Sequence, residues 1–584
     1  MGILIQTVRV SGFRGLENVE FELGEIIILT GMNNTGKTSL LKAMQIALGN
    51  RQFITSDDFY TSDRNSLDRI VIDLLIIPIN ETAERVGQFE DEWEEVFTVD
   101  RVRLDTRGQS FVPLRTVITF DEIKNTYKSR QYILESWPDF KNEANTYWHE
   151  MDNGIEKSFV FDEVPFFYMD AQRDILEDMK MRNSYLGKMI SKIEYSQEDI
   201  DDIEKQIEDL NQGVVNKSEV LSSLKDALIQ LNTALDNSSE GVEITPFTKK
   251  VRDLNKGLSI YYSDTNESYA MEYHGMGTRS WSSLLILKSF IELLSKKASD
   301  ESLPFFPIIA IEEPEAHLHP NAQKKLYDQI NKIKGQKLIS THSPYIAGSA
   351  SLSEVRSFYK NSSGVMSGRL NVSLLKNEEV RKIERQVVSS RGELFFAKLI
   401  VLFEGETEEQ ALPILAEEFF EKPTLELGID FVGVGGHGNY TPFLIFAKSM
   451  NIPWVIFSDA EEDTVTKVKK QVNDCTGNEE NIVFLTNEND FEKELIADGF
   501  SDQIKKAIVS LEIPNCHNEK HEEAKKAEIE AYSKDSLLQY LKAHKTSCGP
   551  AIAEILKEDG NLPRKVQELF NKIKSIIEPT GQET

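Results

Sequence analysis

GMNNTGKT, residues 31–38, follows the apolar run EIIILT (residues 25–30) and precedes SLLKAMQIAL (residues 39–48), whose apolar residues have helical spacing. A buried strand, a glycine-rich turn and a helix form the context that a phosphate-binding loop requires. In such a loop, backbone N–H groups surround the phosphates, Lys37 reaches the β and γ groups, and the Thr38 hydroxyl binds magnesium. The sequence therefore predicts an ATP site with the nucleotide-binding residues Gly31, Asn34, Thr35, Gly36, Lys37, Thr38 and Ser39.

Two later runs supply the other groups that nucleotide hydrolysis needs. The apolar run at residues 308–311 predicts a buried strand that ends at Glu312 and Glu313, at the edge where open α/β sheets bind ligands. We expect Glu312 to hold Mg²⁺ and Glu313 to act as the general base for the attacking water. The run STHSP (residues 340–344) ends the next predicted strand and places His342 where it would sense the γ-phosphate.

Two neighbouring features are weaker signals. Gly275 and Gly277 lie in HGMGTRS before an apolar helix, and a glycine turn at a helix start is able to bind a phosphate from a second subunit. His317 and His319 are two residues apart, a spacing open to metal ligation. Their segment is already interpreted as the turn beyond the acidic strand, which favours a structural role.

A second group of acids follows two apolar strands in the later part of the chain. Glu404 ends the strand at residues 397–403 and Glu408 lies one helical turn further on, while the strand WVIFS precedes Asp459 and Glu461. Clustered carboxylates repel one another unless cations lie between them. The pattern therefore predicts a divalent-metal site for phosphodiester hydrolysis, with Mg²⁺ as the expected ion and Mn²⁺ or Ca²⁺ as alternatives. Ordinary solvated loop acids are the competing interpretation.

Composition limits the class of protein. The chain has 584 residues and only three cysteines, with no signal segment or apolar run of transmembrane length, so we expect a cytoplasmic protein without a membrane partner. Its net charge of −30 disfavours general coating of DNA, because phosphate repulsion must be overcome by a local basic groove or by metal ions.

The predicted fold is α/β, with a nucleotide-binding domain at residues 1–375, a linker at 376–396 and a small parallel α/β domain with a C-terminal helical part at 397–584. Residues 174–240 show helical periodicity and are expected to form an insertion. Two interpretations of this insertion remain open, a solvated helical face and an arm for self-association.

The motifs of the first half resemble the ATPase head of the ABC and SMC/RecF superclass. The resemblance rests on VRVSGFRGLENVEF, the phosphate loop, GMGTRS, IEEPEAHLHP and STHSP. It implies that two heads sandwich ATP, that Gly275 and Gly277 act across the dimer and that His342 is the switch histidine. The usual Asp-Glu pair is Glu312-Glu313 here, and the signature is shorter than that of transporters, which favours the DNA-repair branch.

The second half resembles a Toprim domain, and its position behind the ATPase head is similar to the OLD (overcoming lysogenization defect) family, which includes the Gabija nuclease and retron-associated relatives. The resemblance rests on RGELFFAKLIVLFEGETEE, GGHGN and FSDAEED. By this resemblance the metal ligands are Glu404, Glu408, Asp459, Glu461 and Glu492, and Lys545 stabilises the pentavalent phosphate. Glu461 replaces the second Asp of the familiar Asp-x-Asp, so Glu462 and Asp463 are alternatives to it. Asp490 and Glu494 are alternatives to Glu492 in the same way.

The resemblance implies an ATP-regulated, metal-dependent DNA endonuclease or nickase in anti-phage defence. A homodimer or homotetramer is expected, together with either a UvrD-like helicase or a retron reverse transcriptase and its RNA–DNA product. The alternative is an ATP-switched DNA-binding or scaffold protein whose Toprim domain is catalytically silent. The departure at Glu461 and the acidic net charge motivate that alternative.

Overall fold

The computed structural model describes residues 2–49, 54–61, 67–140, 147–148, 154–181, 184–191, 197–222, 261–264, 267–361, 364–388 and 390–578. The chain divides into two compact units. Unit 1 comprises Met1–Tyr168, Ile308–Glu315 and Pro320–Thr584, and unit 2 comprises Met169–Pro307 and Ala316–His319.

The phosphate-loop strand lies inside a six-stranded sheet of order β15-β14-β3-β13-β12-β9, whose outermost strands are β15 (Gly364–Gly368) and β9 (Phe166–Met169). β3 (Ile26–Gly31) pairs in parallel with β13 (Gln336–Ser340) on one side and β14 (Val355–Asn361) on the other. β12 (Ile308–Glu312) pairs in parallel with β13. β3 and β12 consist mainly of buried apolar residues, whereas β13 and β14 also bury polar and charged side chains. The loops that follow β3, β12 and β13 leave from one edge. α1 (Lys37–Ala47) then begins directly after the glycine loop, as predicted.

A second sheet is antiparallel, and the sequence predicts only its first strand, from the β-branched run ILIQTVRV at residues 3–10. Its order is β2-β1-β4-β6-β7-β8, with β5 paired to β6. The strands are β1 (Gly2–Phe13), β2 (Leu16–Glu22), β4 (Arg69–Ile79), β5 (Arg103–Leu104), β6 (Ser110–Asp121), β7 (Thr126–Ile133) and β8 (Ile155–Glu156). Gln336 of β13 joins the two sheets by hydrogen bonds with Ile5 N and Ile5 O, at 3.1 and 2.9 Å.

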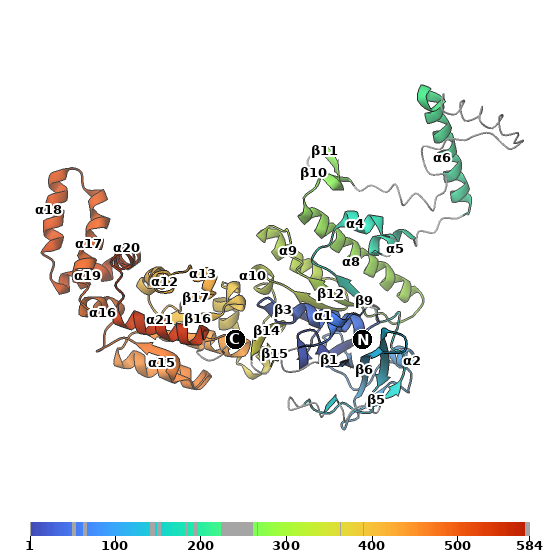
Figure 1. Ribbon diagram of the computed structural model, residues 1–584, viewed down its shortest axis with the longest axis horizontal. Coiled ribbons are helices and arrows are strands. Elements are labelled where there is room, and N and C mark those ends of the chain that lie inside the picture. Colours follow the sequence, from blue (N-terminus) through green and yellow to red (C-terminus); the bar gives the residue numbers. More distant parts are fainter. Residues whose placement is uncertain are drawn as a thin grey trace, which may run out of the picture. The chain divides into compact units, whose positions relative to one another are not determined.

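Unit 2 is mainly helical where it is described. Its elements are α4 (Ile175–Lys180), α5 (Tyr185–Ser191), α6 (Gln197–Lys217), the hairpin β10 (Tyr261–Asp264) and β11 (Glu267–Ala270), and α8 (Met276–Asp300). α4 and α5 pack beside α8 (Figure 1). The helical prediction for residues 174–240 is confirmed at α4, α5 and α6, and residues 182–183, 192–196 and 223–240 of that insertion lie outside the described residues.

The segment expected to be a linker is folded and packed. It contains α11 (Asn377–Ile383), a π-helical turn (Glu384–Val388) and a 3₁₀ helix (Gly392–Phe396). Val387, Val388 and Phe395 are buried, so this part of the chain has core residues among its charges.

The C-terminal domain is built on a four-stranded parallel sheet of order β17-β16-β18-β19, which confirms the predicted small parallel domain. Its strands are β16 (Leu399–Phe403), β17 (Ile429–Gly433), β18 (Trp454–Ser458) and β19 (Ile482–Phe484). Because β16 and β18 are neighbours and parallel, the residues after Phe403 and Ser458 meet at one edge.

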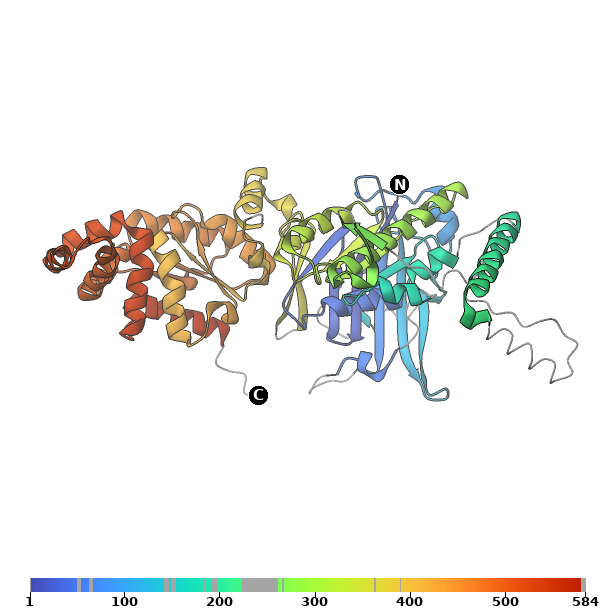
Figure 2. The ribbon, with the colours of Figure 1, turned by 90° about the horizontal axis from the view of Figure 1, so that it is seen from above.

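Helices surround and extend this sheet. They are α12 (Glu406–Phe420), α14 (Tyr440–Met450), α15 (Glu462–Cys475), α16 (Phe491–Ala497), α17 (Ser501–Glu512), α18 (Glu519–Glu530), α19 (Lys534–Ala543), α20 (Lys545–Glu558) and α21 (Arg564–Ile577). α17, α18 and α20, drawn in orange and red, lie side by side in both views (Figures 1 and 2). Within the described part of the chain, no helix is long and apolar enough to cross a membrane.

Candidate functional site

The phosphate loop holds its lysine against its own backbone. Lys37 Nζ donates hydrogen bonds to Gly31 O at 2.7 Å and Met32 O at 2.8 Å. Gly31 has a φ of 122°, and a Cβ at this position would lie 2.1 Å from Phe358 O in β14, so only glycine fits. Of the other expected nucleotide residues, the structure leaves Asn34 and Thr38 exposed, Ser39 and Gly36 half-buried and Thr35 buried.

Glu312, Glu313 and His342 lie at the ends of the strands beside this loop. Glu312 ends β12 and is 8% exposed. Glu313 follows with a φ of 40°, and its N–H donates to Ser340 O in β13 at 2.9 Å. This bond ties the acidic turn to the strand that precedes His342.

The electrostatics show that these groups share one site. Burial lowers the pKa of Lys37 to about 8, against the charges of Glu313 and Glu315, which raise it. Burial, then the charge of Lys37, lowers the pKa of His342, while Glu313 raises it. The charge of Glu313 acts on Lys37 and His342, and that of Lys37 acts on His342, so the three groups lie within electrostatic reach of one another, as a nucleotide-hydrolysing centre requires.

The two predicted signature glycines have different surroundings, both within unit 2. Gly275 is exposed at the N-cap of α8, and a Cβ added there would meet no atom within 4 Å. A Cβ on Gly277 would lie 2.5 Å from His317 O. Gly277 therefore has a packing role against the turn of His317, whereas the surface at Gly275 is open. His317 and His319 are both exposed, and the described residues place neither in a group that could hold a metal ion.

Glu404 stands at the end of β16, where three elements meet. Ser458 Oγ, at the end of β18, donates to Glu404 Oε1 at 2.7 Å. His437 Nδ1, in the glycine loop after β17, lies 3.7 Å from Glu404 Oε2. Burial raises the pKa of Glu404 above its usual value.

Glu408 and Asp459 lie at the same edge of the sheet, where the charge of Asp459 reaches Glu408. Burial raises the pKa of Glu408 to about 8, and the charge of Asp459 adds to this. Burial raises the pKa of Asp459 to about 7, and its next largest cause is the charge of Glu404. The predicted convergence of acids from α12 and from the end of β18 is therefore present in the structure.

Glu492 and Lys545 join this group from α16 and α20. Thr407 Oγ1 donates to Glu492 Oε1 at 2.6 Å, and Lys545 Nζ lies 3.2 Å from the same oxygen. Glu492 is 2% exposed, and its charge raises the pKa values of both Glu408 and Asp459.

The alternatives to Glu492 are engaged elsewhere. Glu494 accepts hydrogen bonds from Thr486 Oγ1 at 2.7 Å and from Asn489 Nδ2 at 2.8 Å, so it braces its own loop. Asp490 caps α16 by accepting from Lys493 N at 2.9 Å, and its carboxylate lies 2.7 Å from Lys542 Nζ. The hydrogen bonds of Asp490 thus lie elsewhere, but its charge raises the pKa of Asp459, as the charge of Glu492 does.

Glu461 occupies the border of the group. It is exposed at the N-cap of α15, and its charge raises the pKa values of Glu404 and Asp459. Glu462 and Asp463 are also exposed, and Asp463 pairs with Lys467 one turn along the helix.

The donor set suits a hard divalent cation, which prefers carboxylate oxygens. Asp459 Oδ1 is buried without a hydrogen-bond partner, as expected of an atom that awaits a ligand. As the side chains stand, however, no three His, Cys, Asp or Glu side chains in the described ranges form a group that could hold a metal ion.

Three polar contacts at this edge were missed by sequence reasoning. They involve Thr407 with Glu492, Ser458 with Glu404, and His437 with Glu404. Only His437 had a signal, the GGHGN loop, to which no role was assigned. Thr407 and Ser458 are common residues inside regular elements, and nothing in their spacing marks them.

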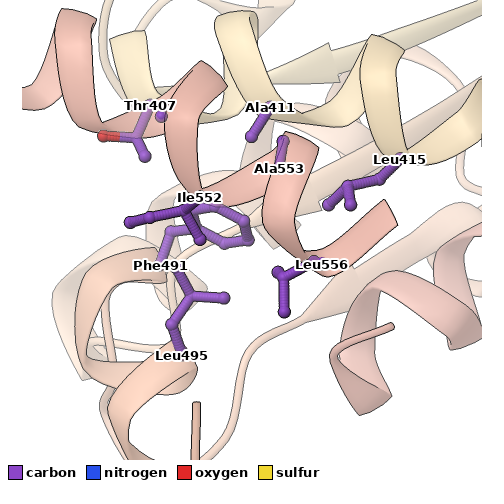
Figure 3. A pocket seen from close by; sticks show the side chains of 9 residues that line it. Thr407, Ala411, Leu415, Phe491, Leu495, Ile552, Ala553 and Leu556 are labelled. Carbon is purple, nitrogen blue, oxygen red and sulfur yellow. The ribbon is translucent and has the colours of Figure 1, made fainter. Parts of the chain in front are cut away.

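An apolar gap lies below Thr407 (Figure 3). Side chains from α12, α16 and α20, among them Leu415, Phe491 and Ile552, point into it. Its apolar lining offers no group for phosphate or metal, so it belongs to the hydrophobic core rather than to the site. This core supports the acidic edge, the edge of the sheet that carries Glu404, Glu408 and Asp459.

Comparison with protein families gives two matches. Residues 4–347 match the model described as AAA ATPase domain, and residues 395–460 match the TOPRIM domain of overcoming lysogenization defect protein-like sequences. The first match spans more than half of the chain.

Three curated relatives match most of the chain. It is 23% identical to the OLD nuclease of Thermus scotoductus, covering 78% of this chain and 82% of that protein. It is 23% identical to the Old nuclease of Escherichia phage P2 (79% and 78%) and 20% identical to the endonuclease GajA of Bacillus cereus (77% and 73%). Among solved structures, the C-terminal region of the Xanthomonas campestris OLD protein is 24% identical over 31% of this chain and 97% of that chain, with a TM-score of 0.25.

Proposed function

Because the chain belongs to the AAA ATPase domain family and carries a Toprim domain of the OLD type, we propose that it is an ATP-regulated, divalent-metal-dependent DNA endonuclease or nickase that acts in anti-phage defence. The similar OLD nucleases and GajA support a nuclease, with DNA as the substrate class. The two domains imply use of a nucleotide and of divalent metal ions.

One observation carries the proposal. Carboxylates from α12, from the end of β18 and from α16 meet at the carboxyl edge of a parallel sheet, and burial raises the pKa values of Glu408 and Asp459 to about 8 and 7. Structural acids of a solvated loop would ionise at ordinary pH without cost. A bound cation stabilises the ionised form of carboxylates that are buried close together more than that of solvated ones.

In the ATPase part, we assign each group a role that its position supports. Lys37 extends to the β- and γ-phosphates, Thr38 and Glu312 hold Mg²⁺, Glu313 accepts the proton of the attacking water and His342 senses the γ-phosphate. The weak basicity of His342 fits this role, since its lowered pKa keeps the imidazole neutral at pH 7 and able to accept or donate a hydrogen bond.

In the Toprim part, Glu404, Glu408, Asp459 and Glu492 would hold the metal ions, with Glu461 at the border. Bound divalent ions would stabilise the attacking and leaving oxygens of the phosphodiester. Lys545, which is paired with Glu492 at 3.2 Å, would stabilise the charge of the phosphate. Ser458 and Thr407 hold Glu404 and Glu492 in orientation through their hydroxyl groups.

The test is plasmid cleavage with Mg²⁺ or Mn²⁺, comparing the wild type with Glu404→Ala and Asp459→Ala. Both variants are expected to lose at least about 100-fold in rate, the scale of a lost electrostatic group in catalysis. Glu418→Ala is the matched control, because Glu418 is an exposed acid on the same α12. Equal cleavage by all four proteins would remove the site assignment.

The alternative is an ATP-switched DNA-binding or scaffold protein with a silent Toprim domain. Two features of the sequence support it, the replacement of the second Asp of the Asp-x-Asp pattern by Glu461 and the net charge of −30. It predicts ATP-dependent retention of DNA without strand scission under any divalent ion. Cleavage that depends on Asp459 would exclude it.

Assembly and partners extend the same proposal. Two ATPase heads would sandwich ATP in a homodimer or homotetramer, with Gly275 contributed across the interface and the insertion at residues 174–240 as a dimerisation arm. The domain limits that we propose are 1–375, with a linker at 376–396, and 397–584. A UvrD-like helicase or a retron reverse transcriptase is the proposed companion. Light scattering with and without ATP tests the assembly.

A further inference from the structure

Glu315 joins the turn after β12 to the turn after β13. Its Oε1 accepts a hydrogen bond from Thr341 Oγ1 at 2.8 Å and a second from the backbone N–H of His342 at 2.7 Å. Both donors belong to the segment that carries the histidine. One carboxylate oxygen thus fixes the backbone of His342 and the side chain next to it.

The second oxygen of this carboxylate lowers the stability of the folded chain. Glu315 Oε2 is buried and has no hydrogen-bond partner. A buried polar atom without a partner is unfavourable, and such an atom in a folded protein calls for a reason other than stability. Burial also raises the pKa of Glu315, while the bond from His342 N lowers it. Glutamate is therefore a poor choice here if the turn only needs to fold.

The imidazole of His342 differs from its neighbours in the chain in its exposure to solvent. The ring of His342 is exposed, whereas Thr341 is fully buried and Ser343 is 4% exposed. Ser343 Oγ caps α10 (Pro344–Ala347) by accepting from Tyr345 N at 3.1 Å, which holds the backbone on the far side of the ring. Thus the backbone around His342 is held on both sides, and the ring lies within electrostatic reach of Lys37 and Glu313, whose charges change its pKa.

We propose that Glu315 is the positioning residue of the ATPase centre, which orients His342 by accepting hydrogen bonds from Thr341 and from the His342 backbone. The proposal rests on the role assigned to His342 in the proposed function. Glu315 itself touches neither the phosphates nor the water. It acts through His342, so its loss lowers turnover and leaves nucleotide binding to the phosphate loop.

The experiment is steady-state ATP hydrolysis by the full chain. Its proteins are the wild type, Glu315→Leu, Glu315→Gln, His342→Ala and the double variant Glu315→Leu/His342→Ala. Glu315→Leu is expected to lower kcat by about 10-fold or more, with KM within about 2-fold, because a catalytic group displaced by about 1 Å loses rate rather than substrate binding. Glu315→Gln keeps an acceptor oxygen and is expected to retain kcat within about 3-fold.

The double variant separates positioning from mere stability. If Glu315 acts through His342, the double variant has the kcat of His342→Ala alone, since residues that act as one unit are not additive. Glu354→Leu is the matched control. Glu354 also belongs to unit 1, and its carboxylate accepts from Tyr327 Oη at 2.7 Å and from Ser351 N at 2.8 Å, with no bond to the His342 segment. It is expected to lose stability with kcat unchanged.

Three results would overturn the proposal: an unchanged kcat in Glu315→Leu, equal losses in the Leu and Gln variants, or multiplying losses in the double variant. If Glu315→Leu does not fold, Thr341→Val decides, because it removes one of the two donors. A loss in kcat of about 3-fold that disappears in the His342→Ala background supports positioning, and no loss overturns it. An unchanged kcat in His342→Ala would instead show that the histidine has no role in hydrolysis. That result would refute the role assigned to His342 in the proposed function, and not only the role of Glu315.

Discussion

At the scale of single residues, Glu408 and Asp459 keep their protons more tightly in the folded chain than an unfolded chain would. Their pKa values of about 8 and 7 compare with about 4 in unfolded peptides, and burial is the largest cause of both shifts. The folded state therefore binds more protons than the unfolded state between those values. Without metal, the contribution of these groups to the free energy of unfolding is present at low pH and is lost as the pH rises toward 8.

This sign gives a prediction for Glu408→Gln, which mimics the protonated acid at every pH. In EDTA, the difference between the Tm of the variant and the Tm of the wild type is expected to increase by about 2–4 °C when the pH is raised from 6 to 8.5. Mn²⁺ should raise the wild-type Tm more at pH 8.5 than at pH 6, because it binds the ionised carboxylates. Differential scanning fluorimetry measures both effects. Glu418→Gln, at an exposed position of the same helix, is the control, and a Tm difference independent of pH would contradict the assignment.

Sequence reasoning located the acids better than their partners. Glu404 and Asp459 were predicted because each follows a short apolar run, and parallel strands bring such ends to one edge. The bond from Thr341 to Glu315 joins residues 26 positions apart, and that from Thr407 to Glu492 joins residues 85 apart. Such pairs depend on how the turns and helices pack in three dimensions, and no periodicity in the sequence encodes that.

At the scale of elements, the start of α8 distinguishes two glycines that the motif treats alike. Gly277 lies against the carbonyl of His317, where a Cβ would approach to 2.5 Å, while Gly275 has open space. Gly277→Ala is expected to lower the free energy of unfolding by about 1–3 kcal/mol, the usual cost of forcing extra atoms into a packed contact. Gly275→Ala should stay within about 0.5 kcal/mol of the wild type.

Denaturant unfolding of the full chain measures both glycine variants, and each serves as the control of the other. A loss of ATP hydrolysis in Gly275→Ala at unchanged stability would support a contact across the dimer. Equal stability of the two variants would contradict the packing role of Gly277.

The elements themselves were predictable to different degrees. The strand, loop and helix around Lys37 were predicted because an apolar run, a glycine turn and a helical period follow one another directly. Most of the antiparallel sheet was not, since its strands pair with partners whose registry is set by the whole sheet. The segment at residues 376–396 was interpreted as a charged linker because its buried residues, among them Val387 and Val388, are few and lie between charges.

At the scale of the whole molecule, a net charge of −30 must be reconciled with a DNA substrate. The acidic edge cannot attract phosphates by itself, so divalent ions and local lysines have to supply the positive charge. Two lysines border that edge. Lys542 lies 2.7 Å from Asp490, and Lys545 lies 3.2 Å from Glu492.

Binding of a DNA duplex, followed by fluorescence anisotropy with Ca²⁺ in place of Mg²⁺, tests this balance. In EDTA the affinity is expected to be at least about 10-fold weaker than in Ca²⁺, and Asp459→Ala should remove the difference. In Ca²⁺, Lys542→Met and Lys545→Met should each weaken binding and make the slope of log K against log salt shallower by about 1, since each removes one phosphate contact. Lys534→Met, at an exposed position of α19, should leave the slope unchanged. Equal slopes in all four proteins would mean that the DNA binds elsewhere, and the acidic edge would then lack its substrate.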